Sequence, residues 1–451
     1  MNLAFDTLQN HPLKTALGTT TAYRIPAVKV SPQNTCHIAF YLEDLNGGGV
    51  QRMVSIIAGA LAERGHRVEL VLCAGEGLLR RQIPAGVKIT ELQAVPNLLA
   101  RAYALAADPG ALGVMSRPLL LPLKPPRTLS YLPALARYLR HEQPDVLFAA
   151  TPYLNIVAVL ARRLAGVTTR LVISERNNLS AKVVSRPGYH PIDWRRRYLS
   201  PLMQQAYLQA DAIVAVSDGV ADDLAERIAI PRLAITRIYN PTLLPDLPEK
   251  AKEPVDHPWF APGNPPVVLA VGRIGRQKDF GTLLRAFARV RATRPARLVI
   301  LGATTGLGRK TEHVNMNKLL ALAARLGISD DVALLGFVPN PFAYMARAAV
   351  LVLSSLHEGF PNVLVEALGC GCPVVSTNCP SGPAEILDNG RFGPLVPVGN
   401  DIAMAEAMGA VLDRPLAKEQ LRARAAVFSF DQAIDSYEAI LLGKRPLQSL
   451  P

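Results

Sequence analysis

The segment HIAFYLEDLNGGGVQRMVSIIAGALAERGHRVELVLC, residues 37–73, has the pattern of a strand, a helix and a second strand. An apolar run opens it, three consecutive glycines follow, and the apolar residues then recur at helical spacing as far as Gly65. The second apolar run, RVELVLC, follows directly. This order forms a βαβ unit, which predicts a parallel sheet.

The same alternation continues along the chain and then begins again after a Pro-rich, charged stretch. A chain of 451 residues is too long for one core of usual size, so we expect two domains. The fold class that we predict is α/β, with two doubly wound Rossmann-like domains that face each other across a cleft. The predicted segments are a poorly ordered extension (1–34), a first domain (35–245), a linker (246–265) and a second domain (266–427). Within the first domain, residues 96–127 look irregular and fit an insertion with one helix.

Composition and cysteine usage indicate a compartment. Apolar residues make up 49% of the chain, but no uninterrupted run is long enough for a helix that spans a bilayer. The N-terminus lacks the basic start and apolar block of a secretory signal. Five cysteines do not suggest a disulfide framework, and Cys370 and Cys372 are expected to be small core residues. We therefore expect a cytoplasmic protein.

The positive charge of the chain is concentrated in its first half. The formal net charge is +13, and residues 1–250 hold 28 Lys and Arg against 19 Asp and Glu. Such a bias suits nucleic acid, an anionic membrane surface or a phosphorylated acceptor, and composition alone does not choose among them. DWRRRYL, residues 193–199, would suit a lipid headgroup or an acceptor phosphate, although it would also suit an exposed charged turn. No nucleic-acid module is recognisable, so we expect peripheral contact with an anionic membrane and no nucleic acid.

Two glutamates lie in HEGFPNVLVEALGCGCPVVSTNCPSGPAEIL, residues 357–387, around the start of a predicted helix. Glu358 precedes Gly359, where a backbone without a side chain can approach a ligand closely. Glu366 lies about two turns along the helix. A diphosphate at the start of that helix would meet free amides and the positive end of the dipole. The alternative is that Glu358 only caps the helix and Glu366 is solvated.

EGFPNVLVEALGCGCPVV, residues 358–375, resembles the signature EGFxxxxxEAxxxGxPVV of the family-4 retaining glycosyltransferases. The resemblance covers roughly residues 36–445 and implies the GT-B fold, with a helix at 428–443 that returns to the first domain. It also implies that Glu358 contacts the donor sugar and that Glu366 binds the ribose hydroxyls. Further donor contacts implied near this signature are Gly359, Phe360, Pro361 and Asn362. STNCPSGPAEIL resembles the subset that builds bacterial polysaccharides and lipid-linked oligosaccharides.

VGRIGRQKDF, residues 271–280, resembles the family's VGRLxxxKG signature, although Gly281 follows Phe280 and not Lys278. The resemblance assigns Arg273 and Lys278 to the donor diphosphate. Departure of a nucleoside diphosphate develops negative charge, which fixed cations in a dry cleft stabilise. We therefore predict that Arg273, Lys278 and Glu358 form the catalytic group. Without the resemblance, two basic residues in a loop would indicate a solvated face.

GGGVQR, residues 47–52, resembles the Gly-rich loop of the family's first domain. Gly48 and Gly49 would then approach the donor phosphates, and Arg52 would bind the phosphate or the acceptor. A tight turn between a strand and a helix would also use these glycines.

SERNN, residues 174–178, ends a predicted strand and resembles a first-domain motif of the polysaccharide-building subset. Polar residues at the end of a strand are well placed for acceptor contact, although they also form local loop bonds. The candidates for acceptor contact are Glu175, Arg176 and Asn177. Where many relatives carry a histidine after the preceding strand, this chain has Thr151 and Pro152, so no catalytic histidine can be transferred.

Two further regions are implied by resemblance to lie at the donor. Val338 falls where the family packs the nucleotide base, and Ser381 and Gly382 fall in a loop near the sugar and phosphate. No Asp-x-Asp and no His/Cys cluster suggests a metal site, so we expect no metal and no cofactor.

The predicted activity is retaining transfer of a sugar from a nucleoside diphosphate donor, preferably a UDP-sugar, to a hydroxyl of a glycan or lipid-linked acceptor. The setting would be cell-surface polysaccharide synthesis, in the cytoplasm or at the inner face of the cell membrane. One alternative is a GT-B sugar-nucleotide epimerase or hydrolase, because the fold also serves those chemistries. Another is a non-catalytic scaffold that binds a sugar nucleotide.

Overall fold

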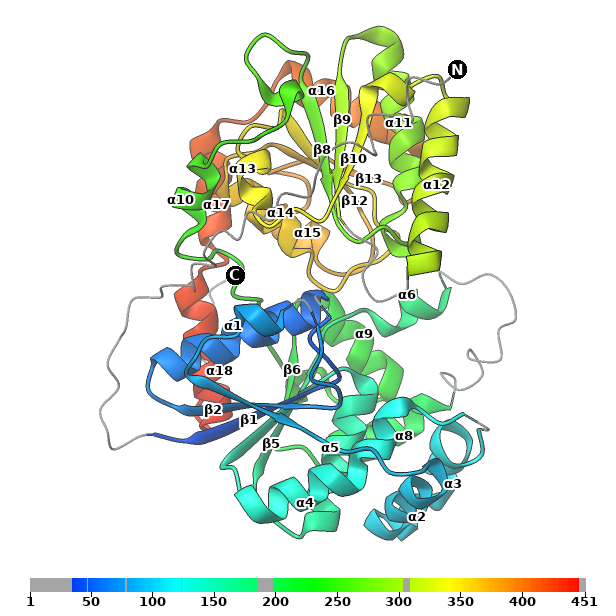
Figure 1. The fold of residues 1–451 in the computed structure, drawn as a ribbon, viewed down its shortest axis with the longest axis vertical. Helices are drawn as coiled ribbons and strands as arrows, with labels where there is room; N and C mark the ends of the chain where they lie inside the picture. Colours follow the sequence, from blue (N-terminus) through cyan, green and yellow to red (C-terminus); the bar gives the residue numbers. More distant parts are fainter. Residues whose placement is uncertain are drawn as a thin grey trace.

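The computed structural model describes residues 35–445, except 47, 78, 123, 185–197 and 303–308. Figure 1 shows two sheets in separate halves of the molecule, each covered by helices. All strand pairings within the two sheets are parallel. The predicted pair of doubly wound α/β domains is therefore confirmed.

The first domain is built on a sheet with the strand order β3-β2-β1-β4-β5-β6-β7. The order reverses between β1 and β4, the point at which open α/β sheets bind ligands at the carboxyl ends of their strands. All six residues of β1 are buried, as expected for a strand covered on both faces. The strands are β1 (His37–Leu42), β2 (Arg67–Leu72), β3 (Val87–Glu91), β4 (Val146–Ala150), β5 (Arg170–Glu175), β6 (Ala212–Ala215) and β7 (Ile235–Arg237).

The second domain repeats this plan with the order β10-β9-β8-β11-β12-β13. Its switch point lies between β8 and β11, so the carboxyl ends of these two strands mark the expected ligand position. The strands are β8 (Val267–Val271), β9 (Arg297–Leu301), β10 (Val332–Gly336), β11 (Val350–Leu353), β12 (Val374–Thr377) and β13 (Leu395–Val396).

Helices pack on both sheets and complete the two cores. Those before β8 are α1 (Gly49–Glu63), α2 (Asn97–Ala107), α3 (Leu112–Met115), α4 (Leu132–Glu142), α5 (Pro152–Ala165), α6 (Leu179–Val184), α8 (Leu199–Tyr207), α9 (Asp218–Ile228) and α10 (Leu247–Lys252). Those after β8 are α11 (Phe280–Thr293), α12 (Arg309–Arg325), α13 (Pro341–Met345), α14 (Asn362–Gly369), α15 (Pro383–Ile386), α16 (Asp401–Asp413), α17 (Lys418–Ala426) and α18 (Phe430–Leu441).

The last helix returns to the first domain. α18 contacts α1 and β5, and Arg64 at the end of α1 forms ion pairs with Asp435 and Glu438. An isolated parallel bridge joins Leu243 to Ser429, so the outgoing and returning chain segments lie side by side. The segment that we expected to be a linker contains α10, which packs on α13 of the second domain.

The stretch 96–127 is more regular than predicted. It contains α2, α3 and a π-helical turn at Ser116–Leu120, where we expected one helix. Pro109 and Gly110 divide the stretch into short pieces, which hid its helical periodicity.

Cys370 and Cys372 are buried core residues, as predicted. Among the residues that the model describes, no helix is both long and apolar enough to cross a membrane.

Candidate active site between the two sheets

Glu358 and Lys278 form an ion pair at the carboxyl-end edge of the second sheet. Lys278 Nζ lies 2.7 Å from Glu358 Oε1, and the two side chains are only 16% and 10% exposed. Ser355 Oγ donates a second hydrogen bond to the same oxygen at 2.7 Å. Gln277 Nε2 donates to the carbonyl of His357 at 2.8 Å. The carboxylate is therefore held in one position by several donors, as a group that orients a ligand must be.

Local backbone geometry explains why Lys278 reaches Glu358. β8 ends at Val271, and Gly272 follows with a φ of +158°. A Cβ at Gly272 would lie 2.7 Å from Cε of Lys278, so the lysine stem passes directly over the glycine. Asp279 then adopts a φ of +42° and caps α11 by accepting from the Thr282 amide. The motif at 271–280 thus makes a short turn that aims Lys278 back at the sheet edge.

Three glycines lie at this edge, and two of them, Gly302 and Gly336, fall outside the motifs identified in the sequence. Gly272, Gly302 and Gly336 lie at the ends of β8, β9 and β10, all with positive φ. A Cβ at Gly302 would lie 1.9 Å from the Gly272 carbonyl oxygen, and the Gly302 amide donates to the Gly336 carbonyl at 2.7 Å. Their signal was available, because each glycine ends or directly follows an apolar run. At Gly336, by contrast, a built Cβ meets nothing within 4 Å, which leaves room for a ligand at this edge.

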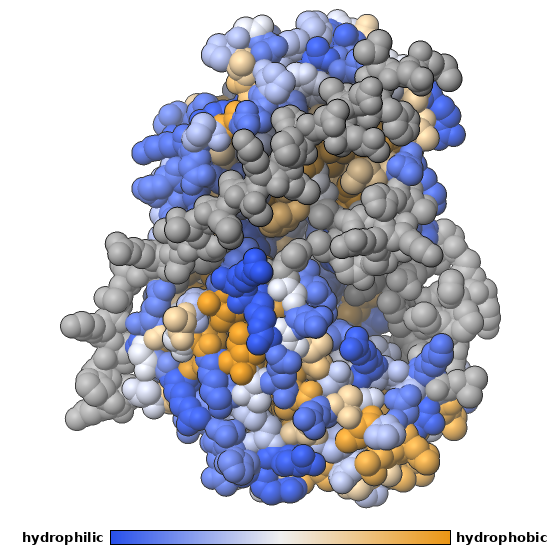
Figure 2. All heavy atoms as spheres, viewed as in Figure 1, coloured by the Kyte–Doolittle hydropathy of each residue, from blue (hydrophilic) through white to orange (hydrophobic). Residues whose placement is uncertain are grey.

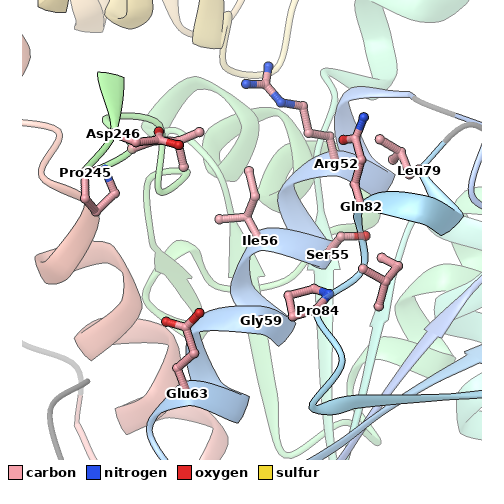
Figure 3. Close-up of a pocket in the computed structure, with 12 residues that line it drawn as sticks. Arg52, Ser55, Ile56, Gly59, Glu63, Leu79, Gln82, Pro84, Pro245 and Asp246 are labelled. Carbon is pink, nitrogen blue, oxygen red and sulfur yellow. The ribbon is translucent and has the colours of Figure 1, made fainter. Parts of the chain in front are cut away.

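Glu366 lies on α14 of the second domain and forms an ion pair with Arg52 of the first domain. Arg52 Nη1 lies 3.0 Å from Glu366 Oε1, and the glutamate side chain is 5% exposed. Arg52 projects from the first turns of α1, and Figure 3 shows its guanidinium directed away from that helix. Gly48 caps α1 without a side-chain hydrogen bond, so the first amides of this helix face the same region. Gly49 has nothing within 4 Å of a built Cβ.

A pocket lies beside Arg52 (Figure 3). It is bounded by α1, by the segment 79–84 and by residues 244–246, where the chain leaves the first domain. Ile56, Leu79 and Leu244 give it an apolar lining.

The two domains meet closely at Gly359. A Cβ there would lie 2.0 Å from the carbonyl oxygen of Arg176 in the first domain, so only glycine permits this approach. Ser217 Oγ donates to the Gly359 carbonyl at 2.7 Å. Glu385 on α15 accepts from the amides of Asp218 and Gly219, each at 2.9 Å, and so caps α9 of the other domain. Burial raises the pKa of Glu385, although these two amide hydrogen bonds oppose the shift.

The loop at Ser381 and Gly382 packs on residues 359–361, which follow Glu358. Gly382 has a φ of +95°, and a Cβ on it would lie 2.5 Å from Cδ of Pro361. Ser381 Oγ accepts from Asn178 Nδ2 of the first domain at 3.0 Å. The structure thus brings Pro361, Ser381 and Gly382 close to Glu358, whose amide donates to the Pro380 carbonyl.

Phe360 and Asn362 have structural contacts in this conformation. The Phe360 ring stacks on Tyr239 with centroids 5.1 Å apart and meets Phe428 edge-on at 5.5 Å. The side-chain oxygen of Asn362 accepts from Asn240 at 2.8 Å and from Thr242 at 3.3 Å. Both side chains therefore hold residues 360–362 against other segments of the chain, residues 239–242 and Phe428.

Two further residues that we predicted to contact the donor are Arg273 and Val338. Arg273 is exposed and forms no hydrogen bond or ion pair with any described residue. Val338 is half-buried against the core beside Phe337, whose side chain is 60% exposed.

Glu175 and Arg176, which we predicted to contact the acceptor, are buried side chains of the first domain. Glu175 is 1% exposed and accepts hydrogen bonds from Tyr207 and Asn155 inside the first domain. Arg176 is 6% exposed, with its guanidinium near the rings of Phe148 and Tyr437. Glu175 is the last residue of β5, where its side chain falls in the core. Asn177 alone is half-buried, and its Cα lies 3.0 Å from a Cβ built on Gly359.

Thr151 carries backbone strain at the carboxyl end of β4. Its φ is +93°, an outlier for a β-branched residue, and its amide donates to the Ser174 carbonyl at 3.1 Å. Strain of this kind clusters at functional sites and costs on the order of 1–3 kcal/mol.

Two further expectations concern a metal site and contact with a membrane. Among the described residues, no group of three or more His, Cys, Asp or Glu could hold a metal ion. The run Asp193–Arg197, on which the membrane expectation rested, lies outside the described residues.

Two family models and several known proteins match this chain. Residues 47–242 match a model described as Glycosyltransferase Family 4, and residues 265–414 match one described as Glycosyl transferases group 1. The N-acetylgalactosamine-N,N'-diacetylbacillosaminyl-diphospho-undecaprenol 4-alpha-N-acetylgalactosaminyltransferase of Campylobacter jejuni is 33% identical over 278 residues, 61% of this chain and 70% of that relative.

A second relative matches over a greater length. The lipopolysaccharide core biosynthesis glycosyltransferase LpsE of Rhizobium meliloti is 27% identical over 406 residues, 88% of this chain and 96% of that protein. Among solved structures, Anabaena HepE in complex with UDP and glucose superposes with a TM-score of 0.66 at 19% identity. That comparison covers 90% of this chain and 100% of HepE, and it supports the two-domain fold.

Proposed function

Because the chain belongs to glycosyltransferase family 4, we propose that it is a retaining enzyme that moves a sugar from a nucleoside diphosphate donor, preferably UDP, to a hydroxyl of a lipid-linked glycan. The observation that carries the proposal is the Lys278–Glu358 ion pair at the carboxyl-end edge of the second sheet. The setting that we propose is the synthesis of a bacterial cell-surface polysaccharide, at the inner face of the cell membrane.

Lys278 and Arg273 would stabilise the leaving diphosphate. Cleavage of the bond between the sugar and the phosphate places negative charge on the phosphate oxygen, and a cation fixed in a water-excluded cleft stabilises that charge. Lys278 is already oriented by Glu358, whereas Arg273 is exposed and would turn toward the phosphate when donor binds. Glu358 would then contact hydroxyls of the donor sugar.

Retention of configuration is proposed from the surroundings of Glu358. Its carboxylate is paired with Lys278 and accepts from Ser355, an environment that favours an orienting group over a free nucleophile. In a same-face displacement, the acceptor oxygen bonds to the anomeric carbon on the side from which the phosphate leaves. The leaving phosphate oxygen takes the acceptor's proton, so no protein base is required.

Glu366 would bind the ribose hydroxyls, which requires a rearrangement of Arg52. In this conformation Arg52 neutralises Glu366. When the donor enters, the guanidinium would exchange this carboxylate for a phosphate beside Gly48 and Gly49 at the start of α1. The side chain is 31% exposed, so it has room to move.

The acceptor side of the proposal rests on the Campylobacter jejuni relative, whose name specifies a diphospho-undecaprenol substrate. Asn177 lies against Gly359 and so close to Glu358, which suits contact with an acceptor hydroxyl. The pocket beside Arg52 adds an apolar surface next to α1 of the first domain. A preference for UDP is supported by the HepE complex, in which that protein binds UDP and glucose.

The test is thermal unfolding with UDP, GDP or ADP in excess chelator. A nucleotide at about 100 times its dissociation constant stabilises by about 2.7 kcal/mol, so one of the three should raise the melting temperature. Glu366→Gln should abolish most of this shift. Glu419→Gln, on the exposed part of α17, is the matched control and should retain it. If no nucleotide stabilises the protein without metal, the metal-independent site is wrong.

Release of UDP from a UDP-sugar then separates the alternatives. A transferase releases UDP faster when lipid-linked glycan is added, whereas a hydrolase releases it equally without acceptor. An epimerase changes the sugar without releasing UDP. A scaffold binds the nucleotide and does neither. Dependence on acceptor is therefore the result that we expect.

A further inference from the structure

Helix α2 has its large apolar residues on the outside. Its buried face consists of Ala100, Ala104 and Ala107. The opposite side exposes Leu98 by 80%, Leu99 by 44%, Tyr103 by 37% and Leu105 by 38%. Helical spacing places these four on one contiguous face. A surface helix of a water-soluble protein normally has the reverse pattern, so this face fits an apolar environment.

Residues beyond α2 extend the same surface. Leu112 on α3 is 50% exposed and Leu121 is 68% exposed. Arg101 on α2 donates to the carbonyl of Pro122, which holds the segment around Leu121 against the helix. Figure 2 shows hydrophobic residues gathered where Figure 1 places α2 and α3. We call this set the α2–α3 surface: Leu98, Leu99, Tyr103, Leu105, Leu112 and Leu121.

The charged residues near this surface indicate which kind of partner it fits. Residues 92–141 contain six Lys and Arg and one acidic residue, Asp108. That aspartate is 6% exposed and paired with Arg163, so it presents little negative charge. Exposed Arg117 and Lys124 lie on the segment that carries Leu121. An apolar surface with a basic margin matches anionic phospholipid, in which headgroups meet the cations and acyl chains meet the leucines.

A second observation concerns Tyr198, which follows the run of three arginines identified in the sequence. The Arg117 guanidinium lies 4.3 Å from the ring centroid of Tyr198, and α3 contacts α8, which begins at Leu199. Tyr198 directly follows Arg195, Arg196 and Arg197 in the sequence. Tyr198, the described residue next to this basic run, therefore lies beside Arg117 at the margin of the α2–α3 surface.

We propose that the α2–α3 surface docks the enzyme on an anionic lipid bilayer. The inference rests on the proposed lipid-linked acceptor, because an enzyme that uses such an acceptor must work at a membrane. The structure adds the residues that make the contact. Leucines enter the acyl region and basic residues hold the headgroups, while the cleft remains in water.

Vesicle flotation of the full-length protein tests this proposal without donor or acceptor. The wild type should float with vesicles of phosphatidylcholine and 30% phosphatidylglycerol, and less with pure phosphatidylcholine. Leu98→Gln with Leu105→Gln should lower the partition coefficient by tenfold or more, because two exposed leucines no longer enter the bilayer. Arg117→Gln with Lys124→Gln should weaken binding at low salt and reduce its dependence on salt.

Matched controls replace leucines that are exposed elsewhere. Leu233→Gln, at a residue 98% exposed, and Leu320→Gln, at one 44% exposed, should float as the wild type does. The melting temperature and its increase with UDP check that each variant is folded. Equal flotation of the Leu98/Leu105 variant and the wild type would overturn the proposal. So would a wild type that stays off the vesicles and sediments as a dimer, with the variant a monomer.

Different experimental results would refute the proposed function and the proposed docking surface. A protein that floats but transfers no sugar retains the docking surface and refutes the transferase proposal. A protein that transfers sugar to a detergent-solubilised acceptor but does not float refutes the docking surface alone.

Discussion

The two sheet edges that face each other are built differently. The edge of the second domain presents glycine backbone at Gly272, Gly302 and Gly336, with the paired side chains of Lys278 and Glu358 held beside it. The edge of the first domain places Glu175 inward, bonded to Tyr207 and Asn155, and strains Thr151. A carboxylate after a strand is thus a candidate ligand group at one edge and part of the core at the other.

The difference teaches that position after a strand does not by itself make a residue functional. Glu358 and Glu175 are both buried and both follow or end a parallel strand region. Their partners distinguish them. Glu358 is bonded to a cation at the expected donor edge, whereas Glu175 satisfies neutral donors within its own domain.

The largest effect that we expect is on catalysis by Glu358. Glu358→Gln keeps the shape of the side chain but removes the charge that orients Lys278 and the donor sugar. Acceptor-dependent UDP release should fall about 10²–10³-fold, as when one electrostatic contact to a transition state is lost. Steady-state kinetics measure this. A rate within threefold of the wild type would place the reacting sugar elsewhere.

A methyl group at Gly359 should separate the two edges. Gly359→Ala places a Cβ about 2.0 Å from the Arg176 carbonyl oxygen, so the domains must move apart. Displacements of about 1 Å can cost 10²-fold in rate, and we expect a loss of about that size. Gly409→Ala on α16 is the control, because a Cβ there meets nothing within 4 Å. Small-angle scattering measures the expected opening, and an unchanged profile with full activity would contradict this account.

Glu175 should affect stability, in contrast to Glu358. Glu175→Leu removes the oxygen that accepts from both Tyr207 and Asn155, so the buried Tyr207 hydroxyl loses its acceptor. We expect a loss of about 1–3 kcal/mol in the free energy of unfolding, measured with urea. The acceptor KM should stay unchanged once the protein is folded. A raised KM with unaltered stability would restore the acceptor role that we first predicted.

The smallest effect concerns Thr151. Thr151→Gly relieves the positive φ but makes the unfolded chain more flexible, so we expect a net gain of about 1 kcal/mol or less. Activity should fall if the strain positions the end of β4 at the cleft. Urea unfolding and acceptor-dependent UDP release measure the two effects. A clear loss of stability would show that the threonine side chain holds this turn in place.

Much of the donor side was predictable from residue pattern. Alternating strands and helices gave two parallel sheets, and the two motifs around Lys278 and Glu358 predicted residues that the fold brings to one ion pair. The side chains of Phe360 and Asn362 were less predictable. Their partners, Tyr239 and Asn240, lie in a different part of the chain and meet them only in the folded protein.

The chain's own residues determined the fold class and the expectation of two domains, because strand and helix periodicity and glycine-containing turns are local properties. The motifs around Lys278 and Glu358 were identified by their resemblance to a family signature. Tertiary structure alone decided which polar residues reach the cleft. Burial of Glu175, pairing of Arg52 with Glu366 and the outward leucines of α2 each depend on segments distant in sequence. Burial and long-range pairing come from packing, and no local pattern records which neighbour a side chain will meet.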